Sequence, residues 1–120
     1  MDRFVCIKDF NKPINLRNIL PGITNKWQCC VHSYLIGARE NQIYSLHCNV
    51  INSDRNLKVP ILLTIYPRTD YINYVEHLRW KNIIVSDVIN FELSIVNSLE
   101  NKINPADSSF VLLIFRKNEI

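Results

Sequence analysis

Cysteines and histidines in two short stretches are the residues with the clearest capacity for chemistry. Cys29, Cys30 and His32 lie close together, and His47 and Cys48 follow about fifteen residues later. All are zinc-competent side chains, and the two strands of a hairpin could bring both stretches to one place. Cys30, His32 and Cys48 are then the conceivable three-ligand set.

The spacing favours a simpler interpretation of the same cysteines. Zinc sites usually take paired ligands from a gap of two to four residues, whereas Cys29 and Cys30 are adjacent and point to opposite faces of a strand. Buried free cysteines that act as small hydrophobic side chains are far commoner than such a site. We therefore expect no metal and no cofactor.

Nucleophilic and acid–base catalysis are the next possibilities. Cys30 could pair with His47 or His77, but neither stretch has the flanking glycines or tight turn that usually present a nucleophile. Glu92 alternates to a solvent face and Asp87 lies in a predicted turn, so no two carboxylates share a face as a general acid and base would. We expect that the chain is not an enzyme.

One predicted loop combines aromatic and basic side chains. Small β-barrels bind single-stranded nucleic acid through such groups, but Tyr, Trp and Arg are also enriched at protein interfaces. The formal net charge is only +3, so we favour the protein interface and keep nucleic acid as the alternative. The residues are Tyr66, Arg68, Tyr71, Tyr74, Arg79, Trp80 and Lys81.

The composition is that of one globular domain spanning residues 1–120. Hydrophobic residues make up 48% and charged residues 21%, which excludes a disordered chain. No run of about 18 apolar residues exists, so we expect no membrane span. Met1 to Phe4 lack the features of a secretory signal, and the cysteines are expected to be reduced thiols inside a cell.

Period-2 alternation and short apolar runs predict an all-β chain. In the strand expected at 27–36, alternation places Trp27, Cys29, Val31, Ser33 and Leu35 on one face, and the residues between them on the other.

The other expected elements follow from the same patterns. Residues 14–20 fit either a brief strand or one helical turn, and residues 67–80 suggest a surface loop with a turn of helix. The remaining strands are expected at 4–7, 43–51, 59–66, 81–85, 91–96 and 110–115.

Several segments, taken in order, resemble the penton-type minor capsid proteins of polinton-like viruses and of the related insect-associated adintoviruses. The order spans about residues 27–117, and the chain departs from the family between Asn97 and Asp107, where a Gly-containing turn is usual. The resembling segments are Trp27-Gln28-Cys29-Cys30-Val31-His32-Ser33-Tyr34, Asn41-Gln42-Ile43-Tyr44-Ser45-Leu46, Leu62-Leu63-Thr64-Ile65, Phe91-Glu92-Leu93-Ser94-Ile95 and Val111-Leu112-Leu113-Ile114-Phe115-Arg116.

This resemblance implies a single jelly roll, an eight-stranded antiparallel β-sandwich. It also implies a virion structural protein that forms rings of five at capsid vertices, with copies of itself and other capsid proteins as partners. The expected location is the virion, and the infected cell before assembly. The alternative remains a small β-barrel that binds single-stranded nucleic acid.

Overall fold

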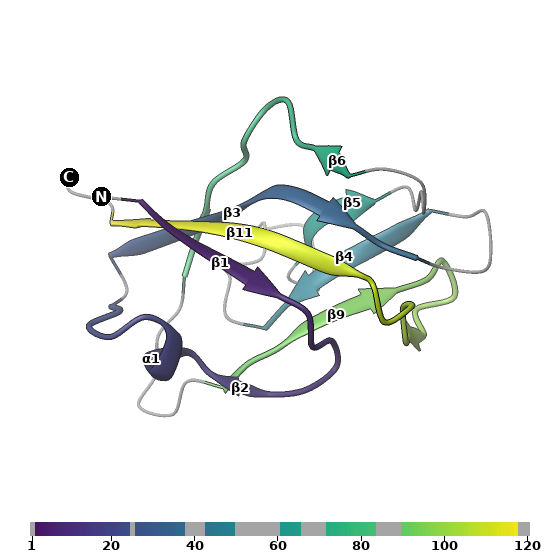
Figure 1. Ribbon diagram of the computed structural model, residues 1–120, viewed down its shortest axis with the longest axis horizontal. Coiled ribbons are helices and arrows are strands. Elements are labelled where there is room, and N and C mark those ends of the chain that lie inside the picture. The colour runs from purple at the N-terminus through teal and green to yellow at the C-terminus, as the bar shows by residue number, and fades with distance from the viewer. Residues whose placement is uncertain are drawn as a thin grey trace.

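The computed structural model describes residues 2–24, 26–37, 43–49, 61–65, 72–83 and 90–117. Its architecture is all-β, as expected, with two main antiparallel sheets and a separate two-stranded pairing (Figure 1). Within these ranges no helix is long and apolar enough to cross a membrane. In chain order the elements are β1 (Arg3–Ile7), β2 (Ile14–Asn15), α1 (Leu16–Ile19), β3 (Trp27–Leu35), β4 (Tyr44–Cys48), β5 (Ile61–Ile65), β6 (Asn73–Tyr74), β7 (Lys81–Asn82), β8 (Asn90–Phe91), β9 (Leu93–Val96), β10 (Lys102–Ile103) and β11 (Phe110–Lys117).

The first sheet is built around β11. This strand lies between β1 and β3, and β6 and β7 both pair with the far side of β3. Figure 1 shows β1, β11 and β3 running side by side across the molecule. The apolar run of β11 was expected of a central strand, and its position confirms that expectation.

The second sheet has the order β10-β9-β4-β5. Strand β9 follows β8 after a break at Glu92, and β8 pairs with β2. The predicted alternation is confirmed here: Leu93 and Ile95 are buried in the core, and Glu92 lies on the opposite, solvent side.

The core lies between the inner faces of the two sheets. Phe115 from β11 and Phe91 from β8 are fully buried, and their rings meet edge to face with centroids 6.3 Å apart. Burying an aromatic side chain of this size is among the largest single contributions to folding. Leu16 of α1 is also buried in this core, so one short helical turn covers an end of the sandwich.

The predicted assignment of side chains to the two faces of β3 is wrong beyond a bulge in this strand. Val31 pairs with Leu113 and Ser33 with Leu112, so His32 is an extra residue without an opposite partner on β11. One inserted residue reverses the alternation that follows it. Cys29 and Val31 share one face, as predicted, and this face meets the core, but beyond the bulge it is Tyr34, from the other predicted set, that faces the core.

Two irregular segments can be compared with their predictions. Residues 14–20 contain both predicted alternatives, because β2 runs directly into α1, whose N-cap Asn15 accepts a hydrogen bond from the Arg17 backbone amide. The segment predicted as a loop with a turn of helix contains instead, in its described part, the short strand β6.

Candidate interaction surface and polar pocket

Three rings form a row on the outer face of the first sheet, which points away from the core. The ring of His32 lies 6.0 Å from that of Phe4 and 6.0 Å from that of Tyr74, and both contacts are edge to face. Phe4 belongs to β1, His32 to β3 and Tyr74 to β6. Alternation along β3 already points His32 outward with Cys30, and the bulge brings the following residue, Ser33, to the same side, where its register partner is Tyr74.

The ring row covers apolar side chains that face away from the core. Ile114 of β11 is only 4% exposed and Cys30 of β3 is fully buried, although neither belongs to the core cluster. Phe4 and Tyr74 themselves remain 60% and 68% exposed. We call Phe4, Cys30, His32, Tyr74 and Ile114 the outer aromatic patch.

A cationic group adjoins the patch on the same sheet. The guanidinium of Arg116 lies 3.8 Å from the centre of the Trp80 ring, a cation–π contact. Arg116 Nε also donates to Gln28 Oε1 at 3.1 Å, and Gln28 Nε2 donates to Asn82 Oδ1 at 2.9 Å. These bonds join β11, β3 and β7 across their registered positions, so Arg116 is held by Gln28, which is itself held by Asn82.

The predicted aromatic and basic loop contributes part of this surface. Tyr74 belongs to the patch, Trp80 stacks on Arg116, Lys81 begins β7, and Arg79 is exposed. Three further predicted residues, Tyr66, Arg68 and Tyr71, lie outside the described residues.

Sequence reasoning missed the partners that come from the two ends of the chain. Phe4 and Arg116 belong to β1 and β11, which are far from the loop in sequence. The sequence contains only a weak sign of these two residues: Phe4 lies at the start of a predicted strand beside a basic residue, and Arg116 ends an apolar run. Neither feature indicates which face of the sheet the side chain occupies.

The thiol of Cys30 does not have the environment of a nucleophile. Its pKa is raised to about 11: burial is the largest cause, Arg116 lowers the pKa in part, and Asp2 makes a smaller contribution that raises it. Cys30 also lies on the first sheet, whereas His47 lies on the second. An activated cysteine needs a lowered pKa, so this group would be protonated at neutral pH whichever histidine were its partner.

The conceivable zinc set is not brought together. Cys48 belongs to the core cluster with Cys29, whereas His32 lies on the outer face of the opposite sheet. Burial raises the pKa of Cys29 well above its usual value, and the neighbouring Cys48 and Cys30 add to the shift. Across the described ranges, no three His, Cys, Asp or Glu side chains are placed to hold a metal ion.

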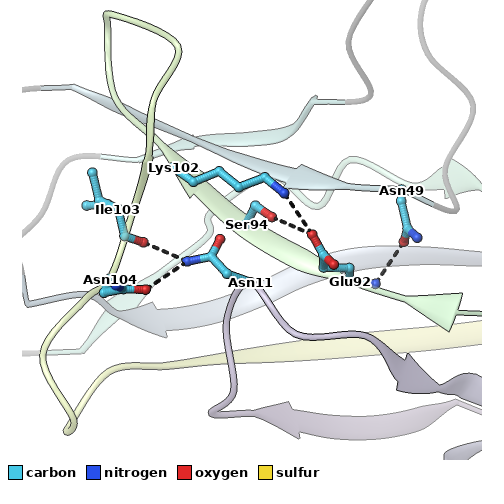
Figure 2. A network of polar contacts seen from close by, with 7 residues as sticks. All are labelled: Asn11, Asn49, Glu92, Ser94, Lys102, Ile103 and Asn104. Carbon is cyan, nitrogen blue, oxygen red and sulfur yellow. Dashed lines mark hydrogen bonds and ion pairs between the residues drawn. The ribbon is translucent and has the colours of Figure 1, made fainter.

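The outer side of the second sheet carries a polar pocket of about 150 Å³. Glu92 lies at its centre: its carboxylate accepts from Lys102 Nζ at 3.0 Å and from Ser94 Oγ at 3.3 Å (Figure 2). The backbone amide of Glu92 donates to Asn49 Oδ1 at 2.8 Å. The pocket is lined by His47, Cys48, Asn49, Glu92, Ser94 and Lys102.

These contacts give the pocket a structural role, because they connect strands of the second sheet to one another. Lys102 joins β10 to the break between β8 and β9, and Asn49 joins the end of β4 to the same break. Burial lowers the pKa of His47, Glu100 opposes the shift, and Lys102 adds to it. The imidazole therefore favours its neutral form, while the charge of Glu92 is balanced by Lys102.

A second junction lies beside this pocket. Asn11 Nδ2 donates to the Ile103 carbonyl at 2.9 Å and to Asn104 Oδ1 at 3.2 Å (Figure 2). The Asn11 backbone amide donates to the Leu93 carbonyl at 2.8 Å. Asn11 has φ 61°, a conformation that asparagine tolerates better than most residues, and it links the segment after β1 to the second sheet.

Comparison with known proteins gives no match: no family model, no curated protein and no solved structure is similar to this chain. The resemblance to penton-type capsid proteins therefore rests on the sequence pattern alone.

Proposed function

We propose that the chain is a single jelly roll whose function is to self-associate into a capsid-like shell. Support for the topology comes from nested pairing. The first strand pairs with the last (β1 with β11), β2 pairs with β8, β3 pairs with β6 and β7, and β4 pairs with β5.

Nested pairing of this kind is what one long antiparallel hairpin gives when it is rolled up. The pairings of β11 with β3 and of β9 with β4 then close the two sheets. If β6 with β7 and β8 with β9 are counted as interrupted single strands, the described residues contain eight strands, with β10 as an addition at the edge of β9. Eight strands in two Greek keys are typical of jelly rolls, including those of viral capsids.

The observation that carries the proposed self-association is the outer aromatic patch. Phe4 and Tyr74 keep most of their ring surface exposed while forming an ordered row with His32. Exposed apolar clusters rimmed by polar groups commonly mark interaction sites, and aromatic residues with arginine dominate the energetics of such interfaces. The adjoining Arg116 and Trp80 supply the arginine and a further aromatic ring.

The two outer faces differ in a way that supports a one-sided contact. On the second sheet the groups around the pocket include His47, Ser94, Glu92 and Lys102, which are polar, and Glu92 accepts hydrogen bonds from both Ser94 and Lys102. On the first sheet the corresponding surface is aromatic. A subunit of a closed shell needs one surface against its neighbours and another toward solvent, and head-to-tail contacts that close by rotation form rings.

The resemblance suggests that these rings contain five subunits and lie at capsid vertices. In that arrangement the patch of one subunit would contact a different surface on the next, because ring contacts are heterologous. Other capsid proteins are the remaining partners that the resemblance implies.

Electron microscopy of the purified protein tests this function. We expect closed rings or shells for the wild type and their loss in the variant Phe4→Ser/Tyr74→Ser. Ile43→Ser is the matched control, because Ile43 is 50% exposed but precedes β4 of the second sheet. Particles that survive the double substitution unchanged would refute the role of the patch.

Binding of single-stranded nucleic acid is the second candidate, because the same face combines aromatic rings with Arg116 and Lys81. Two features favour the protein interface. The ring row is perpendicular from one ring to the next, at 80° and 87°, and one face of Trp80 already holds Arg116. Both features reduce the number of aromatic ring faces that are available for successive bases to stack on.

A labelled oligonucleotide distinguishes the two functions. Nucleic-acid binding predicts association that weakens with salt and is lost in Tyr74→Ala and Trp80→Ala, at about 1–3 kcal/mol for each stacked base. Absence of binding at low salt would eliminate this candidate and leave the shell function in place.

A further inference from the structure

The sheet edges among the described residues are unequal. Strands β2, β6, β7 and β10 are each two residues long, and β5 carries a register shift opposite Leu46 and His47. Short strands and bulges are the usual devices that prevent an edge from pairing with another chain. Strand β1 has neither device.

Strand β1 is a regular edge of five residues. Its register with β11 is unbroken from Arg3↔Phe115 to Ile7↔Val111, and among the described strands it pairs with β11 alone. It contains no proline or glycine, and between Arg3 and Lys8 it carries no charge. Such an edge presents free backbone donors and acceptors to an incoming strand.

We propose that β1 pairs antiparallel with β1 of a second copy of this chain, about a twofold axis at Val5. This pairing would join the first sheets of two copies edge to edge. It goes beyond the ring contact proposed above, since it uses the backbone edge of the sheet, and it rests on that proposal only in requiring that the chain self-associates.

The twofold register places complementary groups opposite each other. Residues an equal number of positions before and after Val5 become partners, so Phe4 faces the partner's Cys6 and Asp2 faces the partner's Lys8. All four side chains are exposed, and side chains of even number in β1 point to the outer face, where Phe4 lies. Each pair occurs twice because the interface is isologous.

This complementarity favours a second copy over a strand of another protein. Asp2 and Lys8 lie at equal distances from Val5 and have opposite charges, which is the arrangement that a twofold axis requires, while Arg3 would face the partner's Ile7, which is uncharged. Directly opposite charges stabilise an antiparallel pair, and like charges destabilise it. Pairing would also extend the outer aromatic patch across two copies through Phe4.

Disulfide trapping tests the register. In Phe4→Cys the new thiol would face the native Cys6 of the partner at a separation typical of directly opposed residues, so mild oxidation should give a covalent dimer. Within one chain, positions 4 and 6 lie about 6.6 Å apart with parallel side chains, which disfavours an internal bond. Phe4→Cys/Cys6→Ala is the matched control and should stay monomeric on a non-reducing gel.

Charge reversal gives an independent readout. Asp2→Lys alone and Lys8→Asp alone each create two like-charge pairs and should weaken dimerisation by roughly fivefold or more. The double variant Asp2→Lys/Lys8→Asp restores opposite pairs and should restore the dimer. Failure of the double variant to recover, or cross-linking of the Cys6→Ala control, would overturn the pairing.

The result separates this inference from the proposed function. If the wild type forms rings or shells and Phe4→Cys gives no cross-link, the β1 pairing is overturned and the shell function stays intact. If Phe4→Cys gives the cross-linked dimer and the wild type forms no rings or shells, the pairing is supported and the shell is refuted.

Discussion

At the scale of single residues, Cys29 and Cys30 are neighbours in the chain with different surroundings. Cys29 points into the core with Cys48, and Cys30 points to the outer face beneath the aromatic row. Both are buried, and burial raises the pKa of both thiols. Cys6 on β1 is exposed. The alternation of a strand thus separates two identical side chains onto different faces, and neither meets the conditions for metal binding or nucleophilic attack.

Thiol labelling at pH 8 measures this difference. We expect one of the four cysteines, Cys6, to react rapidly, because the thiolate is the reactive form and Cys30 with a pKa of about 11 forms little of it. The other three should react only after unfolding, and mass spectrometry of labelled peptides identifies the sites. Labelling of Cys30 as fast as Cys6 would contradict the assigned environment.

Glu100 is the second informative residue, because it has φ 62° in the turn between β9 and β10. The turn is held by Asn97, whose side-chain oxygen accepts from the backbone amides of Leu99 and Asn101 at 3.0 and 2.9 Å. The left-handed conformation costs a residue with a side chain roughly 1–2 kcal/mol. This turn lies where the resembling family usually has a glycine.

Glu100→Gly should therefore stabilise the fold. The relief of backbone strain exceeds the greater entropy of glycine in the unfolded chain, and we expect a gain of about 0.5–1 kcal/mol in the free energy of unfolding. Urea titration measures it, with Glu100→Ala as the control that keeps the Cβ atom. A gain of the same size in the alanine variant would assign the effect to the lost charge instead.

At the scale of the elements, the strands were predictable where one face is buried along their whole length. Residues 91–96 alternate, and their inward side chains were identified correctly from sequence. The bulge at His32 was not predictable, because an inserted residue leaves no mark on composition and is defined only by the partner strand. The two-residue strands β6 and β10 are too short to show a period.

The candidate surface was predictable only within the segment that contributes Tyr74 and Trp80. Their partners Phe4, His32 and Arg116 come from strands whose pairing spans the whole chain. A pattern along the sequence reports which residues share a strand face, but contacts of this range depend on the topology of the fold.

Phe115 tests the assignment of β11 as the central strand. It is fully buried and meets Phe91 across the core, so Phe115→Ala should lower the free energy of unfolding by about 3–5 kcal/mol. Leu99→Ala is the control: Leu99 is 77% exposed, and its truncation should change stability by less than about 0.5 kcal/mol. Chemical denaturation of both variants gives the comparison, and equal losses would contradict the described core.

At the scale of the whole molecule, the outer faces of the two sheets differ in chemical character. The second sheet carries bonded polar groups around Glu92, whereas the first carries the outer aromatic patch next to Arg116 and Trp80. The nested pairing of strands supports the proposed jelly roll, and the aromatic face and the regular edge of β1 are the two surfaces through which we propose that copies contact one another. The central claim is that this chain acts as an assembling subunit.

Sedimentation equilibrium of the wild-type chain tests that claim most directly. We predict a mass that rises with concentration from 14.1 kDa to a defined multiple of it, because the proposed contacts between copies would be specific and closed. A mass of 14.1 kDa at every concentration up to the solubility limit would contradict the account.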